Sequence, residues 1–276
     1  MALYQNTTFA TTNQLVTDIK NFLSTNGWTI DLDTTYGSYN RIHIHKGGNH
    51  FEIYGTSTAA ITMYACTGYN SGSAPNAQPG VSYQKNFGYL ATGSLVCLVS
   101  CGNSAYFGAT YNGPTGTWMW AMIGTVETKF GAWNGGQLAV GIAGTTCFGT
   151  NIGNSSGGCG QVWIEGAWSH TPSTSLVVNG IYALWSSAVS LTSKGPNDFN
   201  AAIVPFPIVL FRINASTTSF YHPLGYLPGI YNVRAGDLYS IGDIIVTGAD
   251  QYLLMPANAA GLNQGNGYDF LFKLSA

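Results

Sequence analysis

Charged residues are scarce in this chain of 276 residues, because Asp, Glu, Lys and Arg make up only 7% of it, against about a quarter in ordinary soluble domains. Neutral polar residues must therefore cover the surface. Thr suits strands, and Gly, Asn and Ser suit turns, whereas helices favour Ala, Glu, Lys and Leu. The composition thus argues against an all-α fold. The 45% of hydrophobic residues argue equally against a disordered chain.

Runs of positive charge and long apolar runs are also missing. No window collects four or more Lys or Arg, and the formal net charge is −2, so we expect no nucleic-acid partner. The apolar stretch 203–211 is interrupted by Pro205 and Pro207 and is much shorter than the roughly 20 residues of a membrane helix. We therefore predict no membrane insertion. Met1 leads directly into Ala-Leu-Tyr-Gln-Asn without a basic segment and an apolar one, so we expect synthesis in a cytoplasm.

The cysteines offer neither a zinc ribbon nor a fully paired secreted scaffold, because they form an odd set without a Cys-x-x-C pair. They are Cys66, Cys97, Cys101, Cys147 and Cys159. Along one extended strand the Cα atoms of Cys97 and Cys101 would lie roughly 13 Å apart, which is beyond the reach of a disulfide. We expect buried thiols that pack as small hydrophobic residues. Pairing between copies of the chain is the alternative.

One segment near the start has helical periodicity. Thr11 can cap it, Gln14 follows three residues later as in a capping box, and apolar residues recur on one face until Asn26-Gly27. This pattern predicts an amphipathic helix at about residues 12–25. From Trp28 onward, short apolar runs alternate with Gly, Asn, Ser or Pro, which is typical of a sandwich or barrel. The sequence therefore predicts a mainly β fold of antiparallel, sandwich-like sheets with one N-terminal helix.

The expected strands are separated by turn residues. Residues 95–99 and 105–110 flank Cys101-Gly102-Asn103-Ser104 as a hairpin. Further strand candidates are 117–126, 138–142, 161–168, 176–186 and 203–213. The glycine-rich region 141–160 has few bulky side chains, so we predict a long exposed loop there. A composition shift near 221–225 predicts a β-rich main domain, 1–224, followed by a small C-terminal β unit, 225–276.

The most distinctive set of potential ligands lies in residues 41–53. With Gly47-Gly48 at the turn, the residues pair as 46:49, 45:50, 44:51, 43:52 and 42:53. One face then carries Ile42, Ile44, Phe51 and Ile53, and the other carries His43, His45, His50 and Glu52. Such imidazoles could hold one divalent metal ion, and a threefold axis could multiply the ligand set. A half-buried hairpin must also present polar residues to water. We adopt this simpler interpretation, a solvated or interface face, and predict no metal and no other cofactor.

Catalytic motifs do not stand out. Serines are scattered and outnumber the available bases, so none is marked as a nucleophile. Glycoside hydrolysis needs two facing carboxylates, for which Glu52, Glu127 and Glu165 are candidates, and the seven Trp and 17 Tyr could stack on sugars. Composition does not pair these carboxylates, and aromatic residues in β-rich chains mostly fill the core. We therefore predict no catalytic residues and no enzyme activity.

Several short segments resemble a group of tailed-bacteriophage virion proteins. The first are Asn26-Gly27-Trp28-Thr29, Phe51-Glu52-Ile53-Tyr54-Gly55, and Cys66-Thr67-Gly68-Tyr69-Asn70 followed by Gln78-Pro79-Gly80. Gly88-Tyr89-Leu90-Ala91-Thr92-Gly93 leads into the central hairpin, and the ending is similar at Leu227-Pro228-Gly229-Ile230-Tyr231, at Tyr252-Leu253-Leu254-Met255-Pro256 and at Asp269-Phe270-Leu271-Phe272. Gly-Tyr and Leu-Pro-Gly are expected to mark turns. The aspartate-rich and arginine-rich strings of several members are missing here.

The resemblance implies a structural component of a virion, in the tail, the baseplate or an attachment appendage such as a tail fibre. It transfers no catalytic residues. The expected partners are copies of the chain in a symmetric homo-oligomer, other virion proteins and, at the host, surface glycans. Low charge reduces repulsion between subunits and is compatible with extensive contacts. The alternative is a lectin or glycoside hydrolase that acts on bacterial surface glycans at the tail tip.

Overall fold

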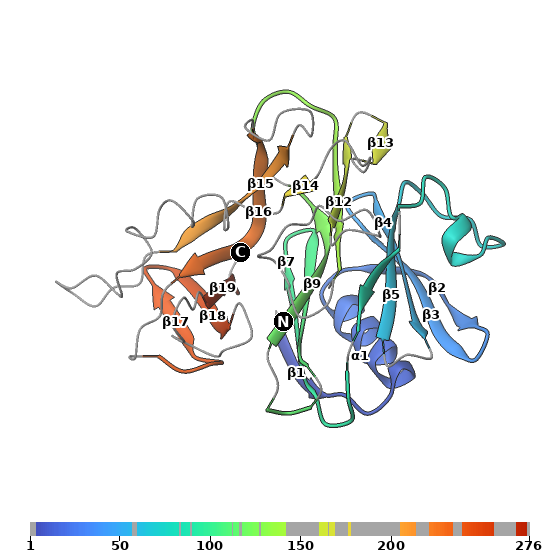
Figure 1. The fold of residues 1–276 in the computed structure, drawn as a ribbon, viewed down its shortest axis with the longest axis horizontal. Helices are drawn as coiled ribbons and strands as arrows, with labels where there is room; N and C mark the ends of the chain where they lie inside the picture. Colours follow the sequence, from blue (N-terminus) through green and yellow to red (C-terminus); the bar gives the residue numbers. More distant parts are fainter. Residues whose placement is uncertain are drawn as a thin grey trace.

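The fold is mainly β and is built from three antiparallel sheets and one α-helix within the part of the chain that the structure describes (Figure 1). The computed structural model describes residues 4–56, 60–82, 84–88, 90–111, 113–115, 118–126, 128–141, 160–164, 166–168, 176–177, 205–213, 221–233, 239–256 and 269–274. The fold class predicted from the sequence is therefore confirmed. None of the helices formed by these residues is long and apolar enough to cross a membrane.

The N-terminal sheet, on the right in Figure 1, has the strand order β2-β3-β4-β5-β6. Its strands are β2 (Thr29–Tyr36), β3 (Tyr39–Lys46), β4 (Asn49–Thr56), β5 (Ala60–Cys66) and β6 (Lys85–Phe87), with a short 3-10 helix, η1 (Pro75–Ala77), between the last two. The predicted β3–β4 register is confirmed, because Ile44 pairs with Phe51 and His45 pairs with His50. The turn needs glycine, since Gly47 and Gly48 have φ values of 57° and 77°.

The central sheet has the order β1-β7-β8-β9-β11-β12-β13. Its strands are β1 (Tyr4–Thr8), β7 (Leu95–Cys101), β8 (Ser104–Thr110), β9 (Trp118–Thr125), β11 (Gly135–Val140), β12 (Gly160–Ile164) and β13 (Ala167–Trp168). The predicted hairpin at 95–110 is confirmed as β7–β8, which turns at Gly102 and Asn103. Strand β1 is an addition to the predicted elements, and it pairs with β7 from Tyr4↔Val99 to Thr8↔Leu95.

The C-terminal sheet, on the left in Figure 1, has the order β14-β15-β16-β19-β18-β17, and β10 also pairs with β16. Its strands are β10 (Thr128–Lys129), β14 (Leu176–Val177), β15 (Phe206–Ile213), β16 (Tyr221–Val233), β17 (Ile244–Thr247), β18 (Asp250–Pro256) and β19 (Asp269–Lys273). A small C-terminal β unit is thus present. Strand β16 spans residues 224 and 225, where the sequence places the domain boundary, and the division into two domains stays a prediction.

The segment Leu227-Pro228-Gly229 is not a turn, contrary to the expectation from sequence. It lies inside β16, opposite a register shift between Pro207 and Val209 of β15. Gly229 has a φ of 67°, so the segment forms an irregularity within the strand. The hydroxyl of Tyr106 in β8 donates a hydrogen bond to the carbonyl oxygen of Pro228 at 2.6 Å. This irregularity therefore joins the C-terminal sheet to the central sheet.

Helix α1 (Thr12–Thr25) matches the predicted bounds. The hydroxyl oxygen of Thr11 accepts a hydrogen bond from the backbone N–H of Gln14 at 3.1 Å, and Asn26 caps the other end. The helix packs against strands of the N-terminal sheet and against β7 of the central sheet. Its buried apolar residues are Leu15, Val16, Ile19, Phe22 and Leu23, and they belong to one core cluster that extends through all three sheets.

The other strands predicted from the sequence are found where they lie within the described residues. Strand candidates 117–126, 138–142, 161–168 and 203–213 correspond to β9, β11, β12 with β13, and β15. Of candidate 176–186 only β14 is described, and residues 142–159 of the expected loop lie outside the described residues.

Cys66, Cys97 and Cys101 are buried as thiols, as predicted. The positions Cys147 and Cys159 lie outside the described residues.

Candidate functional site

The polar face of the β3–β4 hairpin is partly buried, so the expectation of a solvated face is wrong for two of its four residues. The side chains of His43 and Glu52 have 0% exposure. His45 and His50 keep 30% and 20% of their side-chain surface exposed. The buried half of this face lies beneath a segment that follows β5, residues 67–80, which we call the cover segment.

The cover segment is held to the hairpin by specific contacts. The ring of Tyr69 lies 4.5 Å from the ring of His43, between centroids. The carbonyl oxygen of Ser73 accepts a hydrogen bond from Nη2 of Arg41 at 2.8 Å. Gln78 fixes the segment internally, because its side chain donates to the carbonyls of Asn70 and Ser73, both at 3.1 Å. These contacts remove one half of the hairpin face from water.

Beneath the cover segment, one carboxylate joins two basic side chains. Nε of Arg41 donates to Oε1 of Glu52. Nδ1 of His43 lies 2.7 Å from the second oxygen, Oε2. A buried charge needs such partners, because an uncompensated carboxylate in the interior is strongly destabilising. Because a carboxylate only accepts, Nδ1 of His43 donates to Glu52, and Nε2 lies on the far side of the ring.

The other ring nitrogen of His43 faces a second group of polar side chains. Nε2 of His43 lies 3.3 Å from Nδ1 of His50. Asp31 completes the group, because its Oδ2 lies 2.7 Å from Nδ1 of His45 and 3.7 Å from Nδ1 of His50. One potential ligand atom each from Asp31, His45 and His50 lies within 4.8 Å of the others. We call Asp31, His43, His45 and His50 the histidine cluster.

Asp31 reaches the cluster from an irregular position in β2. Ile30 pairs with Ile44 and Leu32 pairs with His43, so the register shifts between Ile30 and Leu32 and leaves Asp31 as an extra residue. Such bulges alter the direction of nearby side chains. The side chain of Asp31 is 17% exposed. It therefore lies near the surface, at the rim of the buried network.

The environment favours a neutral ring at His50. Burial lowers the pKa of His50 below its ordinary value of 6.5, and the neighbouring His43 and His45 lower it further, while the carboxylate of Asp31 acts in the opposite direction. A neutral imidazole retains a lone pair for a proton or a metal ion.

The structure brings together part of the potential ligand set that the sequence offered as an alternative. The structure gathers His45 and His50, and places His43 beside His50. It adds Asp31, which the sequence does not indicate, because Asp31 reaches the hairpin only through the register shift in the pairing of β2 with β3. Glu52, a candidate carboxylate for glycoside hydrolysis, is engaged by Arg41 and His43 and has no exposed surface. The other two candidates, Glu127 and Glu165, lie outside the described residues.

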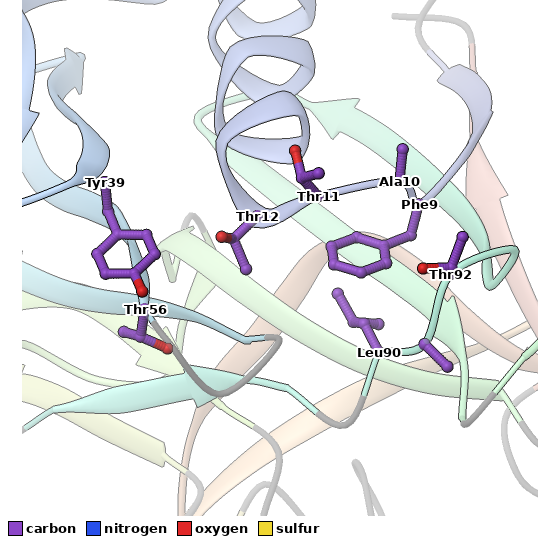
Figure 2. A pocket seen from close by; sticks show the side chains of 9 residues that line it. Phe9, Ala10, Thr11, Thr12, Tyr39, Thr56, Leu90 and Thr92 are labelled. Atoms are coloured by element: carbon purple, nitrogen blue, oxygen red, sulfur yellow. The ribbon is translucent and has the colours of Figure 1, made fainter.

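A separate pocket of about 400 Å³ opens beside the start of α1 (Figure 2). Its wall includes Phe9, Thr11, Thr12, Tyr39, Leu90 and Thr92, which come from α1 and the segment before it, from β3 and from the chain before β7. Among the described residues, the lining is hydroxyl-bearing and apolar, without a carboxylate or an imidazole.

No protein-family model matches the chain, and no curated protein is significantly similar to it. The resemblance to phage virion proteins thus rests on the short segments themselves. Two of them have structural roles here. Residues 67–70 and 78–80 belong to the cover segment, and Leu227-Pro228-Gly229 forms the irregularity of β16.

Proposed function

We propose that the protein is a structural component of a tailed-phage virion, in the tail, the baseplate or an attachment appendage. It acts by assembling with copies of itself and with other virion proteins, not by catalysis. Its site of action is the virion, after synthesis in the cytoplasm of the host bacterium. The segments that resemble virion proteins support this proposal, as does the scarcity of charge, which reduces repulsion between subunits.

One structural observation carries the assembly part of the proposal. Strand β17 is the outermost described strand on its side of the C-terminal sheet. Ile244 and Val246, which lie on one face of β17, are 42% and 63% exposed, and nearby Ile241 is 43% exposed. The strand itself, Ile-Ile-Val-Thr, carries no charge and no proline. Exposed edge strands normally carry charged residues or proline, which prevent pairing with another chain. An edge without them is suited to a subunit contact.

Mass spectrometry of purified virions tests the proposal directly. We expect the chain at several copies per particle. Its absence from particles, or a monomer with enzymatic turnover, would contradict the proposal.

Light scattering of the isolated protein tests whether strand β17 forms the contact between subunits. We expect Val246→Lys to lower the oligomeric state, because a desolvated lysine opposes association. The matched control is Thr34→Lys, which adds the same charge on exposed edge strand β2 without removing an apolar side chain. An unchanged mass for Val246→Lys would exclude β17 as the contact.

The alternative, a glycan-binding or glycan-cleaving protein at the tail tip, is favoured by one aromatic pair. Trp163 and Trp168, on neighbouring strands β12 and β13, have ring centroids 5.1 Å apart and are both only partly buried. Exposed aromatic rings can stack on sugars. Binding of the chain to host surface polysaccharide that is abolished by Trp163→Ala would support this alternative.

A further inference from the structure

Three members of the histidine cluster, Asp31, His45 and His50, have the dimensions of a metal centre, because one ligand atom of each lies within 4.8 Å of the others. Two nitrogens bound to one tetrahedral Zn²⁺ at about 2.0–2.1 Å lie about 3.3 Å from each other. The distance from Nε2 of His43 to Nδ1 of His50 is 3.3 Å. The distances from Oδ2 of Asp31 to the Nδ1 atoms of His45 and His50, 2.7 Å and 3.7 Å, lie on either side of that value. Small movements of two partly exposed side chains would equalise them.

The surroundings of His43 are those of an oriented ligand. A histidine that binds a metal ion usually donates its other N–H to a carboxylate, which fixes the ring and its proton. His43 makes this contact to Glu52 at 2.7 Å, and Arg41 holds the same carboxylate from the other side. Nε2 of His43 then faces Nδ1 of His50.

The chemistry of the donors selects a class of ion. Two imidazoles and one carboxylate suit Zn²⁺ and neighbouring first-row ions, whereas Mg²⁺ and Ca²⁺ prefer sites made of oxygen. One carboxylate leaves a single positive charge on the bound centre. Partial exposure of Asp31, His45 and His50 provides a path for the ion.

We propose that Asp31, His45 and His50 bind one Zn²⁺ ion; His43 contacts His50 and would join as a fourth ligand only after moving toward Asp31 and His45. The expectation of no metal rested on a solvated or interface face, and that premise fails for His43 and Glu52, which are completely buried. The proposal is independent of the virion assignment, because it concerns only side chains within one chain. The site would attach β2 to the β3–β4 hairpin.

Titration calorimetry and thermal unfolding of the full chain, after dialysis against a chelator, test the proposal. We expect one Zn²⁺ per chain at the cluster and a higher unfolding temperature with Zn²⁺, because a ligand that binds the folded state stabilises it. Mg²⁺ at the same concentration should produce no shift. Absence of Zn²⁺ binding at micromolar concentration would overturn the proposal.

Zn²⁺ binding by two conservative variants tests whether the ion binds at the cluster. Asp31→Asn and His45→Gln should each weaken Zn²⁺ binding by at least about tenfold, since loss even of a supporting residue around a metal commonly costs that much. Asp33→Asn is the matched control, because Asp33 lies on the same strand but pairs with Lys20. Circular dichroism verifies that each variant folds. Zn²⁺ binding that is unchanged in both cluster variants would place the ion elsewhere in the chain and refute the site.

X-ray absorption at the zinc edge tests His43 separately. Three imidazoles around the ion would support His43 as the fourth ligand. Two imidazoles would refute that assignment while retaining Asp31, His45 and His50.

Discussion

Nδ1 of His43 lies 2.7 Å from Oε2 of Glu52, and neither side chain is exposed to solvent. The two residues are cross-strand partners in the β3–β4 hairpin. Their position on the polar face would normally leave them in water. The cover segment prevents this, with Tyr69 against His43 and Ser73 bonded to Arg41. The hairpin therefore has an apolar core on one side and a buried polar network on the other.

Loss of the central carboxylate should be costly. Glu52→Ala removes the partner of buried Arg41 and of His43, so we expect the free energy of unfolding to fall by about 3–5 kcal/mol. Glu52→Gln retains one acceptor oxygen and should cost less. Asp33→Asn, at the exposed ion pair with Lys20, is the control and should cost about 1 kcal/mol or less. Urea denaturation measures all three. A loss below about 1 kcal/mol for Glu52→Ala would show that the network contributes little.

The two faces of β3 should respond differently to truncation. Ile44 is completely buried, so Ile44→Ala should lower the free energy of unfolding by about 2–5 kcal/mol through lost burial and a cavity. His45 is partly exposed and paired with Asp31, so in metal-free protein His45→Ala should cost about 1 kcal/mol or less. Chemical denaturation in the presence of chelator compares the two. Equal losses would contradict this assignment of the faces.

The irregularity in β16 should tolerate only glycine. Gly229 has a φ of 67°, and an added Cβ would lie 2.6 Å from Cβ of Cys101, so Gly229→Ala combines backbone strain with a steric clash. Gly248 has a similar φ of 63° but no atom within 4 Å of an added Cβ. Gly248→Ala is thus a control for strain alone, at about 1–2 kcal/mol.

The difference between the two glycine variants isolates the packing cost. We expect Gly229→Ala to be the more destabilising by about 1–3 kcal/mol, the usual cost of overpacking. Thermal unfolding of both variants measures it. Equal destabilisation would mean that β16 can move away from β7 without loss.

Cys97 should be unreactive in the folded protein. Burial raises the pKa of its thiol from 9.0 to about 12, and the thiolate is the reactive form. Alkylation at pH 9 followed by peptide mapping should therefore modify Cys97 slowly in native protein and rapidly in denaturant. Between pH 9.0 and about 12 the unfolded chain binds fewer protons at this thiol, so its contribution to stability falls as the pH rises. Rapid labelling of native protein would contradict the burial of Cys97.

Local sequence patterns were enough to predict several elements. The helix at residues 12–25 followed from its apolar periodicity and its Thr11 cap, and both are confirmed. The β3–β4 register followed from the alternation of side chains around Gly47-Gly48. Each of these features involves residues that are close in the chain, so propensity and turn geometry act directly on them.

Other features depended on contacts between distant segments. Strand β1 is short and polar, and it exists because it pairs with β7. The Leu-Pro-Gly segment has the composition of a turn, but the residues on either side of it pair with β15 and β19 and keep it within a strand. Tertiary pairing overrides local preference in both cases.

The sequence by itself determined which residues of the hairpin share a face, because the side chains of a strand alternate strictly. Only the tertiary structure decided what covers each face. The cover segment buries His43 and Glu52, and the bulge of β2 brings Asp31 to His45. Both depend on the packing of segments outside the hairpin, and no local periodicity encodes such packing. For that reason the sequence indicated the histidines as a group, whereas the fold made them a partly buried cluster with a fourth member.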